Sequence, residues 1–186
     1  MNALKTLCIA LLSLGCATAA NAAGGTSSIV IDAQSGNVLY ADKAEELRYP
    51  ASLTKLMTLY ITFNALETGK LKFSDKLKVS STAASRSPSK LGMPAGSYID
   101  VKTAVEALIV KSANDWATVL AEALSPSEAE FAKLMTKTAR KLGMYRTTFK
   151  TASGLPNSAQ KTTAKDLAIL GAAVYHHFPQ YYHLFS

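Results

Sequence analysis

One β-hairpin pattern near the N-terminus is followed by segments whose apolar residues have mainly helical spacing. Residues 28–32 and 38–40 are β-prone and flank the polar, glycine-containing turn 34–37. An isolated hairpin is marginally stable in water, so these two strands need more sheet or a helix to cover them. Helices are predicted over residues 52–66, 101–110, 115–124, 126–142 and 164–177. This order predicts an α+β fold that is mostly helical.

Capping residues and glycines mark the ends of these predicted helices. The segment Ser125-Pro126-Ser127-Glu128 fits a capping box with proline at the first helical position. Thr163 and Asp166 cap the last helix in the same way, and Gly69 and Gly143 each follow a helical run. Between the helices we expect a short strand or loop over 77–82, loops over 83–97 and 149–160, and a break over 178–182.

Composition excludes several classes of protein. The chain has 186 residues, of which 48% are hydrophobic, and its net charge is +7. This much apolar surface is typical of one folded domain and excludes a disordered chain. The basic residues are spread along the chain, and no glycine-rich phosphate loop is present. We therefore expect solvated charged faces and no nucleic-acid partner.

The first 22 residues have the pattern of a secretory signal peptide. Lys5 precedes the uncharged run 7–14, and small residues end at Ala20-Asn21-Ala22. The run is shorter than the roughly 20 residues that a membrane-spanning helix needs. A lipoprotein at Cys16 is the other alternative, but the residue three places before it is Ser13 rather than leucine. Cleavage after Ala22 would remove both cysteines, so we expect an exported protein of the cell envelope with no disulfide and no transmembrane segment.

Ser52 and Lys55 are the strongest candidates for chemistry. A serine hydroxyl is a poor nucleophile unless a base accepts its proton. Residues i and i+3 share a helix face, so Lys55 would lie one turn from the Ser52 hydroxyl and could be that base if burial lowered its pKa. The helix dipole would also favour negative charge developing at Ser52.

The Ser-x-x-Lys pattern alone does not decide between chemistry and structure. The sequence holds two further copies, Ser87 to Lys90 and Ser158 to Lys161, both in polar loops. Only the copy at Ser52 opens an apolar helix. The alternative at this site is that Ser52 caps the helix and Lys55 is a solvated charge.

A second polar element interrupts two apolar helices at Lys111-Ser112-Ala113-Asn114. The Ser112 hydroxyl could relay a proton between Lys55 and a leaving amine. The Asn114 amide could hold a peptide group through its donor and its acceptor together. The alternative is that Ser112 caps the helix that begins at Asp115.

The sequence shows no spacing of histidines and carboxylates that is typical of a metal site. His176, His177 and His183 lie close together, but none has metal-ligand spacing with a carboxylate, and a helix end explains the first two. We therefore predict no metal and no cofactor.

In combination these elements resemble the penicillin-binding and serine β-lactamase superfamily, and more narrowly the low-molecular-mass D-alanyl-D-alanine carboxypeptidases. The resemblance rests first on Ser52-x-x-Lys55 followed by Ser112-Ala113-Asn114. The order and spacing of further fragments support it: residues 28–39, 49–58, 108–115, 142–144, 147–149, 152–157, 162–167 and 178–182. It implies a β-lactamase/transpeptidase-like fold, a helical cluster on an antiparallel sheet, over residues 23–186.

The resemblance also implies roles for the four candidate residues. Ser52 would attack the carbonyl between the terminal D-alanines of a peptidoglycan stem peptide, and Lys55 would be its base. Ser112 would carry the proton to the leaving D-Ala, and Asn114 would orient the substrate. β-Lactam antibiotics would acylate Ser52 by the same route.

The sequence departs from the family at its third motif. No Lys-Thr-Gly triplet is present, and in the family this triplet lies on a sheet strand beyond the region matched here. The resemblance therefore implies a C-terminally truncated domain with only the N-terminal hairpin of the sheet. Two alternatives remain open at this point: an inactive envelope protein, or a class A β-lactamase, although residues 142–151 hold no acid that could position a deacylating water.

Overall fold

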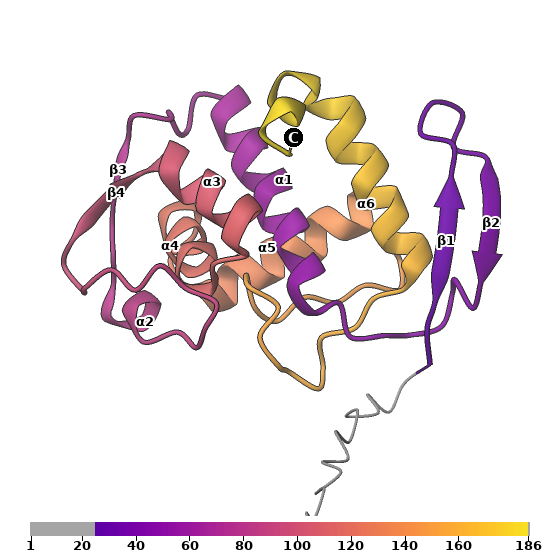
Figure 1. Ribbon diagram of the computed structural model, residues 1–186, viewed down its shortest axis with the longest axis horizontal. Coiled ribbons are helices and arrows are strands. Elements are labelled where there is room, and N and C mark those ends of the chain that lie inside the picture. The colour runs from indigo at the N-terminus through magenta and orange to yellow at the C-terminus, as the bar shows by residue number, and fades with distance from the viewer. Residues whose placement is uncertain (1–24, 186) are drawn as a thin grey trace, which may run out of the picture.

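The computed structural model describes residues 25–185 as a helical cluster flanked by a β-hairpin (Figure 1). The predicted signal peptide and both cysteines lie outside the described residues. The helices are α1 (Thr54–Glu67), α2 (Ser81–Ala84), α3 (Val101–Lys111), α4 (Asn114–Leu124), α5 (Glu128–Lys141) and α6 (Ala164–His177), with 3₁₀ segments at Ala51–Leu53 and Pro179–Phe185. The strands are β1 (Ser28–Ile31), β2 (Val38–Asp42), β3 (Lys76–Lys78) and β4 (Tyr98–Asp100).

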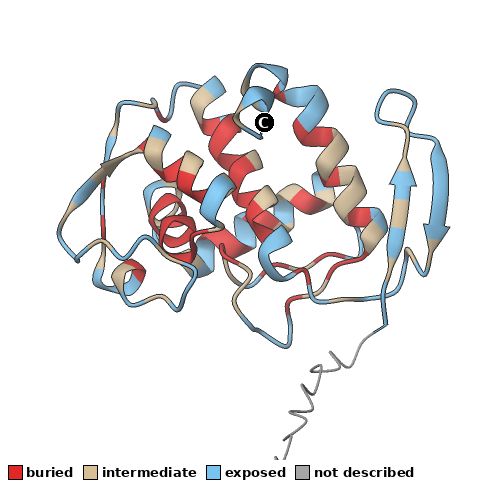
Figure 2. Cartoon of the chain, in the orientation of Figure 1, coloured by how far each residue is buried: buried red, intermediate tan, exposed pale blue. Residues whose placement is uncertain are grey.

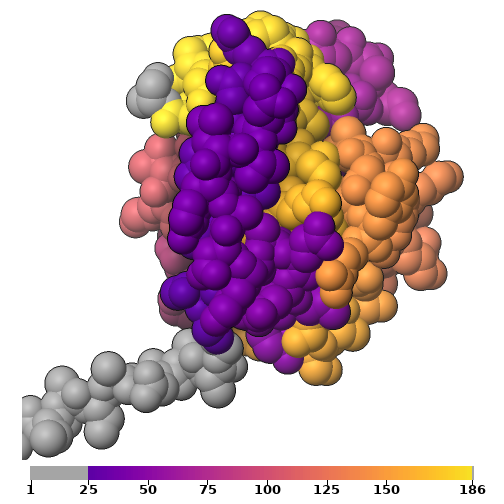
Figure 3. Space-filling model, turned by 90° about the vertical axis from the view of Figure 1, so that its right-hand side faces the viewer, coloured from indigo at the N-terminus to yellow at the C-terminus, as the bar shows by residue number. Residues whose placement is uncertain are grey.

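The predicted hairpin is confirmed. Strands β1 and β2 pair antiparallel, with Ser28 opposite Asp42 and Val30 opposite Tyr40. Figure 3 shows the hairpin lying across one face of the molecule beside α6, which contacts β1. Val30 and Tyr40 remain exposed, so in this structure the helix covers only part of the apolar surface of the two strands.

Helix α1 forms the centre of the molecule. Its residues are predominantly apolar on every side, and Met57 and Phe63 are fully buried. A helix that is apolar all round belongs inside a core, and α1 contacts α4, α5 and α6. Figure 2 shows the buried residues gathered on α1, on α4 and on the faces that the other helices turn toward them.

A second small sheet was not predicted. Strands β3 and β4 pair antiparallel, with Leu77 opposite Ile99. The expected strand or loop over 77–82 is thus a strand that ends at Lys78 and the first turn of the short helix α2. Each strand has three residues, which is too short for a period-two pattern to stand out in the sequence.

One predicted helix start was wrong, and one predicted break is a short helical segment. The N-cap of α5 is Ser127, whose hydroxyl accepts a hydrogen bond from the Glu130 amide at 3.2 Å, rather than Ser125. The expected break over 178–182 is a 3₁₀ segment whose aromatic rings pack on α1. There the Tyr181 ring stacks on Phe63 with the ring centroids 4.8 Å apart. The cap at Thr163 is confirmed, since its hydroxyl accepts from the Asp166 amide at 3.0 Å.

Candidate active site

Ser52 lies in a tight 3₁₀ turn that leads into the central helix. The turn follows Pro50, and the Leu53 amide donates to the Pro50 carbonyl at 3.1 Å. Ser52 is exposed, and no side chain caps either the turn or α1. The alternative that Ser52 serves as a helix cap is therefore wrong, because its hydroxyl accepts no hydrogen bond from a backbone amide of the turn or of α1.

Lys55, in the first turn of α1, is almost completely buried, with 3% of its surface exposed. Its ammonium nitrogen lies 3.4 Å from Ser52 Oγ and donates to the Ser153 carbonyl at 2.7 Å. Burial disfavours the charged form and lowers the pKa of the Lys55 ammonium to about 8. The alternative of a solvated charge is wrong. A neutral amine is thus accessible near neutral pH beside the serine hydroxyl.

Ser153 and Gly154 were not singled out from the sequence as site residues. The loop that carries them is held against α1, because the Thr58 hydroxyl donates to the Ala152 carbonyl at 2.7 Å. Gly154 has φ +88°, and a Cβ at this position would lie 1.8 Å from the Ala51 carbonyl oxygen. The loop therefore approaches the Ser52 turn to a distance that only glycine allows. The sequence offered one signal for this loop, because residues 152–157 are among the fragments that carry the family resemblance.

Ser112 is the C-cap residue, directly after the last residue of α3. Its backbone is left-handed, with φ 53° and ψ 39°, a conformation that is uncommon for a residue other than glycine and that recurs at functional sites. Helix α4 begins at Asn114 with no side-chain cap, so the alternative that Ser112 caps this helix is wrong. Ser112 lines the same groove as Ser52 and Lys55.

Asn114 is buried and its amide group binds a neighbouring loop. Its Nδ2 donates to the Ser87 carbonyl at 3.1 Å and to the Pro88 carbonyl at 3.2 Å. In the part of the chain that the structure describes, its side chain has no hydrogen bond to Ser52 or Lys55. The geometry brings Ser52, Lys55 and Ser112 into one groove, and Asn114 is not among the residues that line it.

The groove around Ser52 has a volume of about 560 Å³ and mostly apolar walls. Side chains from the Ser52 turn, α1, α3 and the C-terminal 3₁₀ segment line it: Leu53, Leu56, Leu59, Leu108, Ile109 and Phe185. An apolar wall beside a polar centre strengthens electrostatic interactions at that centre. Such a site can accept a substrate acyl group next to a serine nucleophile.

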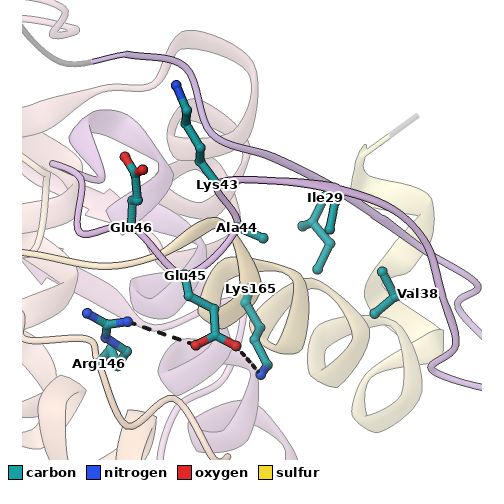
Figure 4. Close-up of a pocket in the computed structure, with 9 residues that line it drawn as sticks. Ile29, Val38, Lys43, Ala44, Glu45, Glu46, Arg146 and Lys165 are labelled. Atoms are coloured by element: carbon teal, nitrogen blue, oxygen red, sulfur yellow. Dashed lines mark hydrogen bonds and ion pairs between the residues drawn. The ribbon is translucent and has the colours of Figure 1, made fainter.

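A cavity of about 540 Å³ lies between the hairpin and α6 (Figure 4). Three of its charged side chains form ion pairs, because Glu45 accepts from Lys165 at 2.7 Å and lies 3.9 Å from Arg146. Pairs this exposed contribute little to stability. No serine is among the described residues that line this cavity, so the Ser52–Lys55 pair lies in a different hollow.

His176 and His177 form hydrogen bonds with protein groups of other segments. His176 Nε2 lies 2.5 Å from the Ala33 carbonyl oxygen, and His177 Nδ1 lies 2.8 Å from the Tyr60 hydroxyl. Over residues 25–185 no group of three or more potential metal-ligating side chains comes together, and no helix there is long and apolar enough to cross a bilayer.

The fold and the serine–lysine geometry define the class of protein. The structure of the D-alanyl-D-alanine carboxypeptidase DacD from Francisella tularensis superposes with a TM-score of 0.84 at 34% identity, over 86% of this chain and 38% of that one. Penicillin-binding protein 5 from Haemophilus influenzae superposes with a TM-score of 0.82 at 32% identity, over 85% and 47%. The fold is thus that of the penicillin-binding proteins, as the resemblance implied.

The family follows from the sequence comparisons. The model of the peptidase S11 family, D-alanyl-D-alanine carboxypeptidase, matches residues 16–186, and the chain belongs to this family. DacF of Bacillus subtilis is 38% identical over 144 residues, which cover 77% of this chain and 37% of DacF. DacC of Escherichia coli is 38% identical over 160 residues, which cover 83% of this chain and 40% of DacC. The chain spans about two fifths of the length of these relatives.

Proposed function

We propose that this chain provides the nucleophile and the base of a serine-type D-alanyl-D-alanine carboxypeptidase. The observation that carries the proposal is the buried Lys55 nitrogen 3.4 Å from Ser52 Oγ, in a groove shared with Ser112. Membership of the carboxypeptidase family supports the choice of substrate, a peptidoglycan stem peptide that ends in D-Ala-D-Ala.

Acylation follows from this geometry. Ser52 Oγ attacks the carbonyl between the two D-alanines, and the neutral Lys55 amine takes the hydroxyl proton. The C–N bond breaks as Ser112 passes its hydroxyl proton to the amine of the leaving D-Ala. Ser112 then takes back the proton that Lys55 had accepted, which returns Lys55 to its neutral form. Water then hydrolyses the Ser52 ester and releases the shortened peptide.

Only the carbonyl oxygen of the Asn114 side chain is assigned a role in this proposal. Because Nδ2 already donates to two carbonyls of the neighbouring loop, Oδ1 is the atom left to orient the substrate, by accepting from an amide N–H. The sequence has no Lys-Thr-Gly triplet, so no residue is assigned to the substrate carboxylate.

β-Lactams are the second class of ligand in this proposal. Penicillin-binding protein D2 from Listeria monocytogenes, in its ampicillin-bound form, superposes with a TM-score of 0.69 at 30% identity, over 83% of this chain and 62% of that one. A strained lactam carbonyl would meet Ser52 as the peptide carbonyl does. When the lactam ring opens, the leaving amine stays attached to the acyl group on Ser52, whereas the D-Ala released from a peptide can diffuse away.

The proposed location is the bacterial cell envelope, where the stem peptide is found. Lys5, the apolar run 7–14 and the small residues that end at Ala22 support export and cleavage of residues 1–22.

The test is covalent labelling of the full chain with a fluorescent penicillin, with Ser52→Ala as the control. We expect one label, placed on Ser52 by mass spectrometry, and release of D-Ala from a synthetic stem peptide. Label that turns over rapidly would favour a β-lactamase instead. Absence of Ser52-dependent label would contradict every acyl-enzyme function for this chain.

The acylation rate should depend on pH through Lys55. Only the neutral amine can take the Ser52 proton, and the pKa of Lys55 is about 8. The rate constant for penicillin acylation should therefore rise as the pH increases from 6 toward 9 and level off above the pKa. A rate that is flat or falls over this range, measured by stopped-flow or quenched labelling, would exclude Lys55 as the base.

A further inference from the structure

One carboxylate, outside the groove, connects the two loops that hold the candidate residues. Glu128 lies in the first turn of α5, and its side chain is 15% exposed. Its Oε2 forms an ion pair with the Arg86 guanidinium, and its Oε1 accepts from the Ala152 amide at 3.0 Å. Arg86 and Ala152 come from segments far apart in the sequence, so Glu128 joins them directly.

The first of these loops holds Lys55. Residues 152–154 stand between the Glu128 carboxylate and the Lys55 ammonium. The Ala152 amide donates to Glu128, and the Ala152 carbonyl accepts from the Thr58 hydroxyl at 2.7 Å. The carbonyl of the following residue, Ser153, accepts from Lys55 at 2.7 Å. A shift of the Ala152 amide would therefore be passed on, through one peptide unit, to the acceptor that fixes the lysine.

The second loop, residues 86–89, holds the end of α3 and the start of α4. Arg86 Nε donates to the Thr118 hydroxyl at 2.9 Å, and the next two carbonyls accept from Asn114. The Ser89 hydroxyl donates to the Lys111 carbonyl at 2.8 Å, immediately before Ser112. This loop thus contacts both sides of the Ser112 turn.

We propose that Glu128 is a positioning residue that holds the two loops in register, so that Lys55 and the Ser112 turn keep their places around Ser52. Hydrogen bonds to a charged acceptor are stronger than those between neutral groups, and partial burial strengthens them further. The catalytic consequence rests on the proposed function, whereas the structural consequence, the restraint on Lys55, does not.

The test compares Glu128→Leu, which loses both partners, with Glu128→Gln, which keeps one acceptor oxygen. The matched control is Glu130→Leu, on the next exposed face of α5, where Glu130 pairs only with Lys133 among the described residues, at 2.6 Å. The first readout is acetylation of Lys55 by acetic anhydride. It is measured by mass spectrometry relative to Lys102, which is 62% exposed in its side chain.

Lys55 should be acetylated about ten- to hundredfold faster in Glu128→Leu than in the wild type, the factor that corresponds to losing a hydrogen bond to a charged group. Glu128→Gln should be intermediate, and Glu130→Leu should match the wild type. If Glu128→Leu shows no cooperative unfolding, Arg86→Met replaces it, with a smaller change in the same direction. Equal acetylation of Lys55 in all variants would overturn the proposal.

The second readout separates this proposal from the proposed function. The penicillin acylation rate constant should fall about ten- to hundredfold in Glu128→Leu, because small displacements of a catalytic group cost this much or more. It should recover partly in Glu128→Gln. If the wild type takes no penicillin, the proposed function fails, and the acetylation of Lys55 still decides the role of Glu128.

Discussion

Lys55→Met should lower the rate constant for acylation of Ser52 by penicillin about 10²- to 10⁴-fold, the range that a positioned general base contributes. Methionine has nearly the length of lysine and fits a buried site, but it cannot accept the Ser52 proton. The measurement is the second-order rate constant for fluorescent penicillin at pH 8, with Lys102→Met as the control on an exposed lysine. An unchanged rate in Lys55→Met would contradict the proposed base.

Lys55→Met should also change how the free energy of unfolding depends on pH. The pKa of Lys55 is about 8 in the folded chain and about 10.4 when the chain is unfolded. Between these values the unfolded state binds more protons, so this group makes the free energy of unfolding rise with pH. We expect that rise between pH 8 and 10 to disappear in Lys55→Met, as measured by urea unfolding. At pH 7 the substitution removes the cost of burying a charged amine, which stabilises the fold, but it leaves the Ser153 carbonyl without its donor, which destabilises it. These two effects oppose each other, so we expect the free energy of unfolding to change little at this pH.

Local patterns in the sequence predicted the parts of the fold that local forces decide. The hairpin at 28–42 has β-prone runs around a polar turn, and the helix predicted over 52–66 is rich in apolar residues; the hairpin and the helix α1 are both present. The sheet of β3 and β4 was not predicted, because pairing Leu77 with Ile99 depends on contacts between distant segments. The packing of the C-terminal 3₁₀ segment on Phe63 is also a tertiary contact.

The candidate site, like the fold, could be predicted only in part from the sequence. The i, i+3 spacing predicted that Lys55 would lie beside Ser52, and the two side chains are in contact in the structure. The acceptor that fixes Lys55 is a backbone carbonyl, which every residue has, so no residue type could mark Ser153. Asn114 was expected to face a substrate, yet its Nδ2 binds the carbonyls of Ser87 and Pro88. A sequence cannot show which of several possible partners an amide takes.

Gly154→Ala should disrupt the site more than any other change of a single methyl group in the loop. The new Cβ would lie 1.8 Å from the Ala51 carbonyl oxygen and 3.1 Å from the Thr54 hydroxyl. Backbone lines this contact, so it cannot be relieved by a side-chain rotation. The loop must move away from the Ser52 turn and take the Ser153 carbonyl with it. We expect the penicillin acylation rate to fall at least about 10²-fold, the cost of roughly 1 Å of misplacement.

Gly143→Ala is the matched control, because Gly143 has nearly the same backbone, with φ +90°, and nothing within 4 Å of the added Cβ. Both substitutions place alanine in a left-handed conformation, which costs about 1–2 kcal/mol. Thermal unfolding should therefore show a loss of this size in Gly143→Ala and a larger one in Gly154→Ala, and only the second variant should lose acylation. Similar losses of stability and activity in the two variants would mean that backbone conformation, and not the close approach to Ala51, is what requires glycine at position 154.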